Sequence, residues 1–265
     1  MRFKTTPLGV ISVYVGGFVA GAAYNDPNLL LAMIVTFFIT AGSMTFNDYF
    51  DWKIDKINHP ERPVPRGVLK PVEMLYFTIV LFTIGTAISY FINLLCFGIV
   101  ILSIIVLFIY EKYSKNISIS GNITVAFVSA ISFTFGGASV GNPYSSLILS
   151  LIAFFIIVSR EIIMDIRDSE GDKLFRKTLP MQIGKKPALY IATVFLLAAV
   201  VLLPVPYFLY ILNGWYLLAI IPVGIITLYA MFHAYLDIKN VDKTASLMRI
   251  ALAIGLIAFI AGALL

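Results

Sequence analysis

Charged residues are scarce in this sequence: only 12% of its 265 residues are Asp, Glu, Lys or Arg, whereas 60% are hydrophobic. A soluble domain carries about 25% charged residues. The composition therefore excludes a soluble globular protein and predicts a polytopic membrane protein.

Cysteine and histidine are also scarce, with one Cys and two His. Cys96 lies in an apolar stretch and has no second cysteine for an internal disulfide, so nothing requires an oxidising compartment. We interpret Cys96 as a packing residue. Neither His59 nor His233 has companions at metal-ligand spacing, which argues against a histidine-based metal site. Because His59 precedes Pro60, we expect it to be structural.

Long apolar runs fill most of the chain, and a membrane-spanning helix needs about 20 mostly apolar residues. The runs that qualify lie at roughly 8–24, 28–46, 72–92, 95–111, 122–140, 145–164, 187–206, 215–235 and 247–265. They predict an all-α polytopic membrane protein with about nine transmembrane helices, in which the turn at Asn93 is the weakest division. The N-terminus leads into the first run without a small-residue cleavage site, so we expect a retained helix.

The basic residues all fall on one predicted face of the membrane. If the N-terminus is cytoplasmic, the inner segments are the N-terminal tip, 47–71, 111–121, 160–186 and 236–249, and they contain all 19 Lys and Arg residues. The outer turns contain none. Because Lys and Arg accumulate on the cytoplasmic side, the sequence predicts a cell-membrane protein with a cytoplasmic N-terminus and a polar face toward the cytoplasm. The net charge of +5 thus reflects topology and does not indicate nucleic-acid binding.

The acids gather in two groups with the same spacing. The first group is Asp48, Asp51 and Asp55, and the second group, 117 positions later, is Asp165, Asp168 and Asp172. On a helix, steps of three and four place side chains on one face, so three carboxylates would converge in each group. The shared offset suggests that residues 1–265 form a single domain with related halves, 1–121 and 122–246, followed by a last helix, 247–265.

Clustered carboxylates repel one another and are costly to keep ionised without cations. Magnesium suits them, because it usually takes one or two carboxylates, several waters and phosphate oxygens of a substrate. Two such groups facing a cavity, with Lys and Arg nearby, would hold a diphosphate through Mg²⁺. If the diphosphate carried an allylic prenyl chain, its departure would leave a carbocation for a nucleophile to trap. The alternative is that these acids form only a solvated face at the helix ends.

These residues resemble the UbiA superfamily of intramembrane prenyltransferases, which has nine transmembrane helices and two Asp-rich cytoplasmic motifs. The first motif, Asn-Asp-x-x-Asp-x-x-x-Asp, is filled by Asn47 and the first Asp group, and the second, Asp-x-x-Asp-x-x-x-Asp, by the second group. The resemblance covers the whole chain. It implies that seven residues bind Mg²⁺ and diphosphate: Asn47, Asp48, Asp51, Asp55, Asp165, Asp168 and Asp172.

A narrower resemblance, to the archaeal digeranylgeranylglyceryl phosphate synthases of that superfamily, rests on the segment 57–67, Arg160-Glu161 and Gly121-Asn122-Ile123-Thr124. Those enzymes transfer a geranylgeranyl group from its diphosphate to the sn-2 hydroxyl of geranylgeranylglyceryl phosphate, which forms the second ether bond of archaeal membrane lipids. The implied partners are a prenyl diphosphate donor, a lipid-phosphate acceptor and the bilayer. The implied phosphate contacts are Arg62, Arg66, Tyr110, Lys115 and Asn122, with Lys185, beside a helix start, as a further candidate.

Two other functions stay open at this point. A prenyltransferase of the same superfamily that acts on an aromatic or quinone-precursor acceptor shares the Asp motifs. A membrane transporter also carries ionisable residues, although transporters usually place them near the midplane, where this sequence has none. The apolar runs exclude a soluble isoprenyl-chain synthase, and the motif of the CDP-alcohol phosphotransferases is absent.

Overall fold

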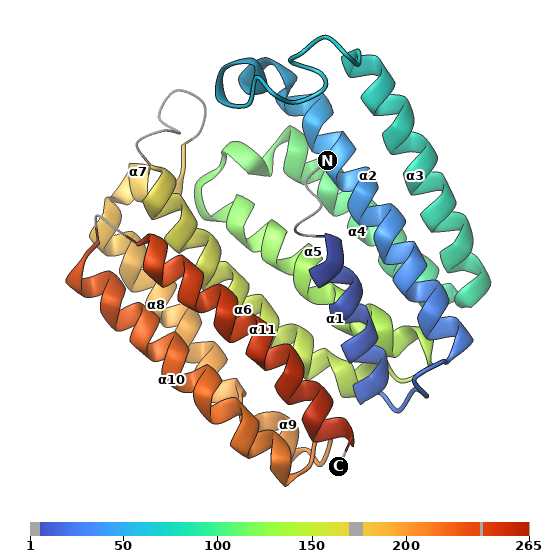
Figure 1. Cartoon of the computed structure of the whole chain (residues 1–265), viewed down its shortest axis with the longest axis vertical. Helices are drawn as coiled ribbons and strands as arrows, with labels where there is room; N and C mark the ends of the chain where they lie inside the picture. Colours follow the sequence, from blue (N-terminus) through green and yellow to red (C-terminus); the bar gives the residue numbers. More distant parts are fainter. Residues whose placement is uncertain (1–5, 170–176, 239–240, 265) are drawn as a thin grey trace.

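The computed structural model describes residues 6–169, 177–238 and 241–264, and every regular element in these ranges is a helix (Figure 1). The long helices are α1 (Thr6–Val19), α2 (Pro27–Asn58), α3 (Pro71–Ile92), α4 (Leu94–Lys112), α5 (Ser118–Ser139), α6 (Pro143–Asp168), α8 (Lys185–Leu202), α10 (Gly214–Leu236) and α11 (Asp242–Leu264). Three short ones are the 3₁₀ helix η1 (Ser114–Asn116), α7 (Leu179–Ile183) and α9 (Val205–Phe208). The all-α class is as predicted.

The predicted count of nine full spans needs a correction at the N-terminal end. Within the described residues, eight helices are long and apolar enough to cross a membrane, with α8 and α9 forming one of these stretches. The run expected at 8–24 forms only α1, of 14 residues. At 1.5 Å per residue α1 is about 21 Å long, shorter than the roughly 30 Å hydrocarbon core. It ends early because the chain turns between Val19 and α2, where Gly21 has a positive φ.

The division at Asn93 is confirmed. Asn93 has an extended backbone (φ −172°, ψ 167°), and its side-chain oxygen accepts a hydrogen bond from the Cys96 amide at 2.8 Å, which caps α4. Its side-chain amide also donates to the Ala138 carbonyl of α5 at 2.9 Å. Cys96 is fully buried in an apolar cluster with Val100 and Val35, in agreement with a packing role.

The first Asp group, and Asp165 and Asp168 of the second, lie on helices that continue beyond the apolar runs, and not in loops as the inner segments 47–71 and 160–186 suggested. Helix α2 extends three turns past the predicted end at residue 46, and α6 extends one turn past residue 164. No Pro or Gly occurs between Asn47 and Asn58, so nothing in the sequence breaks α2 before Pro60. Asp48, Asp51 and Asp55 therefore lie on one continuous helix, where their spacing of three and four residues places them on the same face.

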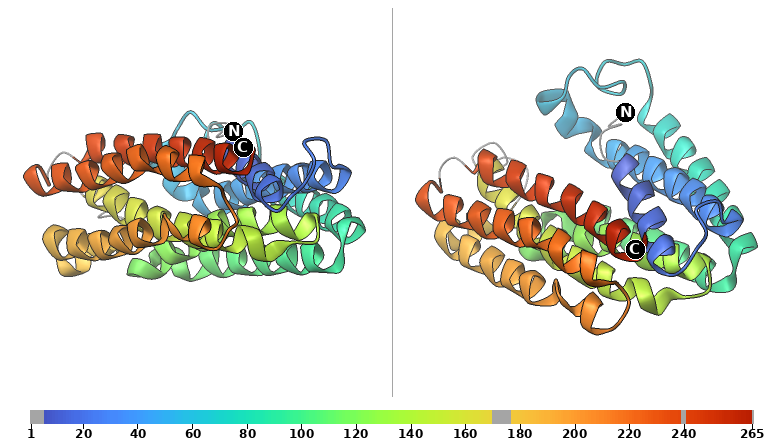
Figure 2. Two further views of the ribbon diagram at one scale, coloured as in Figure 1. Left: turned by 90° about the horizontal axis from the view of Figure 1, so that it is seen from below. Right: turned by 60° about the horizontal axis from the view of Figure 1, so that its bottom comes forward.

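Helices α5 and α6 pack against each other and connect the N-terminal helices of the bundle with the C-terminal ones (Figure 1). The N-terminal helices α2 and α3 lie on one side of this pair and α10 and α11 on the other, and both views of Figure 2 show the same order. The ends of α2, α4 and α6 and the starts of α5 and α11 meet at the same end of the bundle (Figure 1). This arrangement brings the first Asp group and the described members of the second, Asp165 and Asp168, to one end. The proposed division into two related halves stays a prediction.

Small residues of α5 allow the backbones of α1 and α5 to approach closely. A Cβ added at Gly136 would lie 2.0 Å from the Val13 carbonyl oxygen, and one added at Gly16 would lie 2.0 Å from the Phe133 carbonyl oxygen. Membrane helices that pack this tightly need Gly at the contact. Gly136 therefore serves close packing, whereas Thr124, Ser129 and Ser132 of the same helix line the large cavity described below.

We expect Gly136→Ala to destabilise the protein by about 1–3 kcal/mol, because the added methyl group overlaps the α1 backbone. The melting temperature of the detergent-solubilised protein should fall by several degrees, at about 2–4 °C per kcal/mol. Gly224→Ala on α10 is the matched control, since a Cβ there meets nothing within 4 Å. Equal melting temperatures for the two variants would contradict the close contact between α1 and α5.

Candidate active site

The first Asp group occupies the last three turns of α2 and is bound by cations from outside the helix. Asp51 and Asp55 are only 8% and 4% exposed. The Arg62 guanidinium donates to Asp55 and lies 3.6 Å from Asp48, so Arg62 joins the two ends of the group. The loop that carries Arg62 is an ordered turn, as its prolines predict, with the Val68 amide bonded to the Pro63 carbonyl at 2.9 Å.

Lys115 connects α2 with α4 and η1. Its ammonium group donates to Asp51 at 2.7 Å and to Glu111 at 2.9 Å, and the side-chain amide of Asn47 donates to the second Glu111 oxygen at 2.9 Å. The side chains of Lys115 and Glu111 are only 6% and 4% exposed. Sequence reasoning missed Glu111, although its spacing of four from Lys115 in an otherwise apolar helix was a usable signal.

Two members of the second Asp group, Asp165 and Asp168, lie at the end of α6 and have their own partners. Asn122 of α5 donates to Asp165 at 2.9 Å. Arg167 holds Asp168 through two hydrogen bonds, of 2.7 and 2.8 Å, and its other terminal nitrogen lies 3.7 Å from Asp242 of α11. Sequence reasoning also missed Arg167. The third member, Asp172, lies outside the described residues.

The other predicted phosphate contacts are Tyr110, Arg66 and Lys185, and they differ in whether they line the large cavity. Tyr110 lines the large cavity described below, and its ring centroid is 5.9 Å from the Lys115 nitrogen. Arg66 is exposed in the loop between α2 and α3. Lys185 is the first residue of α8. Arg66 and Lys185 do not line the cavity.

Among the residues that the structure describes, no three Asp, Glu, His or Cys side chains converge closely enough to form a metal site on their own. The first-group carboxylates pair with Arg62 and Lys115 instead. The donor set still fits Mg²⁺, which usually takes one or two carboxylates and completes its coordination with water and phosphate oxygens. The metal role of the seven predicted ligands stays a prediction.

A cavity of about 1010 Å³ opens beside the first Asp group and runs among α1, α2, α4, α5, α6, α10 and α11. Its charged lining residues are Asp48, Glu111, Arg160, Glu161 and Arg249. Most of the remaining wall is apolar and includes Ile39, Phe133, Phe135, Ile156, Val223 and Phe259. At the upper end of the usual range for ligand pockets, about 300–1000 Å³, this volume suits a long apolar ligand with a charged end.

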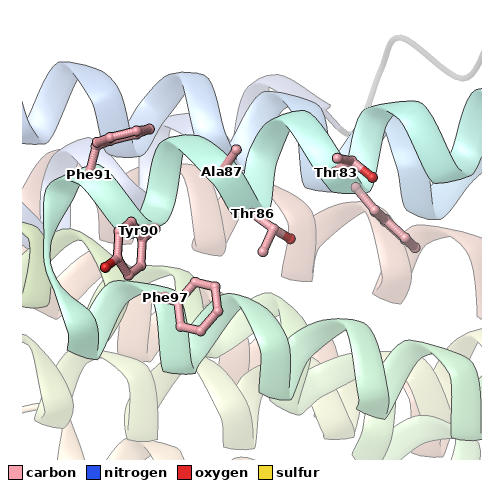
Figure 3. Close-up of a pocket in the computed structure, with 7 residues that line it drawn as sticks. Thr83, Thr86, Ala87, Tyr90, Phe91 and Phe97 are labelled. Carbon is pink, nitrogen blue, oxygen red and sulfur yellow. The ribbon is translucent and has the colours of Figure 1, made fainter.

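A second hollow, of about 520 Å³, lies between α3 and α4 (Figure 3). Thr86, Tyr90, Phe91 and Phe97 line it, and none of its lining residues carries a charge. Tyr90 and Phe91 are largely exposed, as is typical of aromatic side chains on a lipid-facing surface. The chemistry is therefore expected in the larger cavity, beside the Asp groups.

Comparison with known proteins agrees with this architecture. Residues 9–260 match the UbiA prenyltransferase family. The digeranylgeranylglyceryl phosphate synthase of Methanosarcina mazei is 38% identical over 88% of this chain and 81% of its own length. A solved structure described as digeranylgeranylglyceryl phosphate synthase superposes with a TM-score of 0.84 at 34% identity and covers 99% of both chains.

A more distant solved structure shows the fold alone. The UbiA homolog from Archaeoglobus fulgidus, bound to DMAPP and Mg²⁺, has a TM-score of 0.73 at 20% identity and covers 96% of this chain and 95% of its own. The resemblance seen in the two Asp motifs is thus confirmed over nearly the whole length. The chain belongs to the UbiA prenyltransferase family.

Proposed function

We propose that this chain is a digeranylgeranylglyceryl phosphate synthase. It would transfer a geranylgeranyl group from its diphosphate to the sn-2 hydroxyl of geranylgeranylglyceryl phosphate and form the second ether bond of archaeal membrane lipids. The observation that carries the proposal is the 34–38% identity to synthases of this name over most of the chain. The cavity supports it, because its charged end adjoins the first Asp group and its apolar wall suits isoprenoid chains.

Asn47 and the two Asp groups are the proposed ligands for Mg²⁺ and, through it, for the diphosphate: Asn47, Asp48, Asp51, Asp55, Asp165, Asp168 and Asp172. Bound Mg²⁺ would supply positive charge that stabilises the departing diphosphate. The distant relative from Archaeoglobus fulgidus, solved with DMAPP and Mg²⁺, supports this role. The carboxylate and amide oxygens of the two groups are also hard ligands of the kind that Mg²⁺ prefers.

Arg62 and Lys115 would exchange partners when the donor binds. In the structure their cationic groups bind Asp55 and Asp51. If these carboxylates held Mg²⁺, Arg62 and Lys115 would be available to the diphosphate oxygens, where they would stabilise developing negative charge. Tyr110, Asn122, Arg66 and Lys185 are the further proposed phosphate contacts, and only Tyr110 of these lines the cavity.

In the proposed reaction, the bond between C1 of the prenyl chain and the diphosphate oxygen breaks, and its electron pair leaves with the diphosphate. The acceptor hydroxyl oxygen then bonds to C1. Its proton passes to a carboxylate of the first Asp group or to a phosphate oxygen. The apolar wall of the cavity would keep water away from the allylic cation.

The N-terminus and the Asp groups are proposed to face the cytoplasm, because the segments that carry Lys and Arg meet at the end of the bundle that holds these groups. Labelling of a Val68→Cys variant, in the exposed loop after α2, tests this orientation. With Cys96 replaced by Ser, a membrane-impermeant thiol reagent should leave intact cells unlabelled. Labelling from outside would contradict the orientation.

The proposed activity is tested with purified protein, geranylgeranyl diphosphate, geranylgeranylglyceryl phosphate and Mg²⁺. We expect an ether-linked lipid product that disappears with EDTA and returns when Mg²⁺ is added in excess. Product formation that is unaffected by EDTA would contradict the metal assignment. The absence of a product with this acceptor would contradict the proposed function.

A further inference from the structure

Two arginines lie inside spanning helices and on the wall of the large cavity. Arg160 precedes the end of α6 at Asp168 by eight residues, and Arg249 follows the start of α11 at Asp242 by seven. At 1.5 Å per residue, each arginine is about 10–12 Å from the end of the bundle that holds the Asp groups. Charged side chains inside spanning helices are costly and mark functional sites. Arg160 is half-buried, and Arg249 is exposed at the helix face that lines the cavity.

Within the described residues, each of the two guanidinium groups has N–H donors without a hydrogen-bond partner. Arg160 donates from one terminal nitrogen to Glu161 at 2.7 Å, but its Nε atom is buried and has no hydrogen-bond partner. Arg249 makes no hydrogen bond, ion pair or ring contact in the part of the chain that the structure describes. Because Glu161 compensates only one of the two cations, the part of the cavity wall that α6 and α11 form carries a net positive charge.

The cations proposed for the diphosphate are different residues, Arg62 and Lys115. Arg62 and Lys115 lie on the side of α2, α4 and η1, beside the first Asp group. Arg160 and Arg249 belong to α6 and α11, so a second anionic group bound to them would not compete with the diphosphate for those cations. Of the two lipids in the proposed reaction, the acceptor carries this second anionic group as a phosphate monoester.

We propose that Arg160 and Arg249 bind the phosphate of the acceptor lipid, an inference that rests on the proposed function. The planar guanidinium group binds phosphate through paired hydrogen bonds, better than an ammonium group does. The same helices line the cavity beyond these arginines with apolar side chains, among them Ile156 on α6 and Leu252 and Leu256 on α11. A phosphate held by the arginines would thus place the prenyl chain of the acceptor along an apolar wall.

A structural role for each arginine is the competing interpretation. Arg249 could extend its charged end toward the membrane interface, as long basic side chains do. Arg160 could serve only to neutralise Glu161. These roles predict that removal of the Arg249 charge affects both substrates alike or neither, whereas a phosphate site predicts an effect on the acceptor alone.

The test is the steady-state kinetics of Arg249→Gln, a change that breaks no contact seen in the structure. We expect KM for geranylgeranylglyceryl phosphate to rise about tenfold or more, the effect of losing charge-assisted hydrogen bonds. KM for geranylgeranyl diphosphate should be unchanged, and Arg249→Lys should recover part of the loss. Lys243→Gln is the matched control, because Lys243 lies on the same helix and is exposed like Arg249, but does not line the cavity.

A second acceptor without a phosphate, geranylgeranylglycerol, completes the experiment. The wild-type protein should prenylate geranylgeranylglycerol poorly. Arg249→Gln should have the same KM for this acceptor as the wild type, since the acceptor has no phosphate for Arg249 to bind. An unchanged KM for the phosphorylated acceptor, or an equal loss with both acceptors, would overturn the inference while the proposed function stands. A wild-type protein that prenylates neither glycerol lipid would overturn the proposed function and this inference with it.

Discussion

Replacement of Asp51 by Asn should lower prenyl transfer by about 10²- to 10³-fold, the range seen when one preorganised electrostatic group is removed from an active site. Asp51 is buried, and its carboxylate accepts a hydrogen bond from Lys115 at 2.7 Å. The negative charge of Asp51 therefore contributes directly to the electrostatics of the candidate active site. Asn keeps the shape and removes the charge that a metal ion and Lys115 require. The measurement is kcat for ether formation at saturating Mg²⁺, together with the melting temperature of the purified variant.

The matched control for Asp51→Asn lies on the same helix. Asp26 caps the other end of α2, where it accepts hydrogen bonds from the amides of Asn28 and Leu29 at 2.9 and 3.0 Å. Asn caps helices about as well as Asp, so Asp26→Asn should keep full activity. A folded Asp51→Asn protein within a few-fold of wild-type activity would contradict the assignment of the first Asp group.

Replacement of Lys115 by Met should lower both stability and activity. It leaves the buried carboxylates of Asp51 and Glu111 without their shared cation, and the loss of one partner from a buried ion pair costs about 3–5 kcal/mol. It also removes a cation proposed for the diphosphate, so KM for the donor should rise. Lys112→Met is the control, because Lys112 is exposed and contacts only the rings of Phe108 and Tyr113 in the described structure.

A second substitution separates the two roles of Lys115. Glu111→Gln in the Lys115→Met background removes one of the two carboxylates that shared the Lys115 cation, so it should recover part of the lost melting temperature. Activity should stay low, because the cation for the diphosphate is still absent. Recovery of activity along with stability would show that Lys115 serves only the structure.

The positions of the helices were predictable because hydropathy reports where a segment crosses the membrane. Hydropathy does not report where a helix ends once it has left the apolar layer, so α2 was predicted to stop at residue 46 and in fact reaches Asn58. The short α1 was predicted as a full span for the same reason, since apolar residues continue into the turn after Val19.

The Asp groups themselves were predictable because their spacing is local. Their partners were less so: Asn47 meets Glu111, and Asp51 meets Lys115, each across 64 residues of sequence. Such pairs depend on how α2 packs against α4 and η1. The cavity position of Arg249 likewise follows only from the packing of α11. The contacts expected of Arg66, Lys185 and Asp172 stay predictions.

A competition between two acceptors tests the central claim most directly. Purified protein, geranylgeranyl diphosphate and Mg²⁺ are incubated with geranylgeranylglyceryl phosphate and 4-hydroxybenzoate in one vessel, and mass spectrometry measures both products. Our account predicts the ether of the glycerol phosphate and no prenylated aromatic acid. Transfer to the aromatic acid alone would keep the fold and the Asp groups but contradict the lipid-ether function.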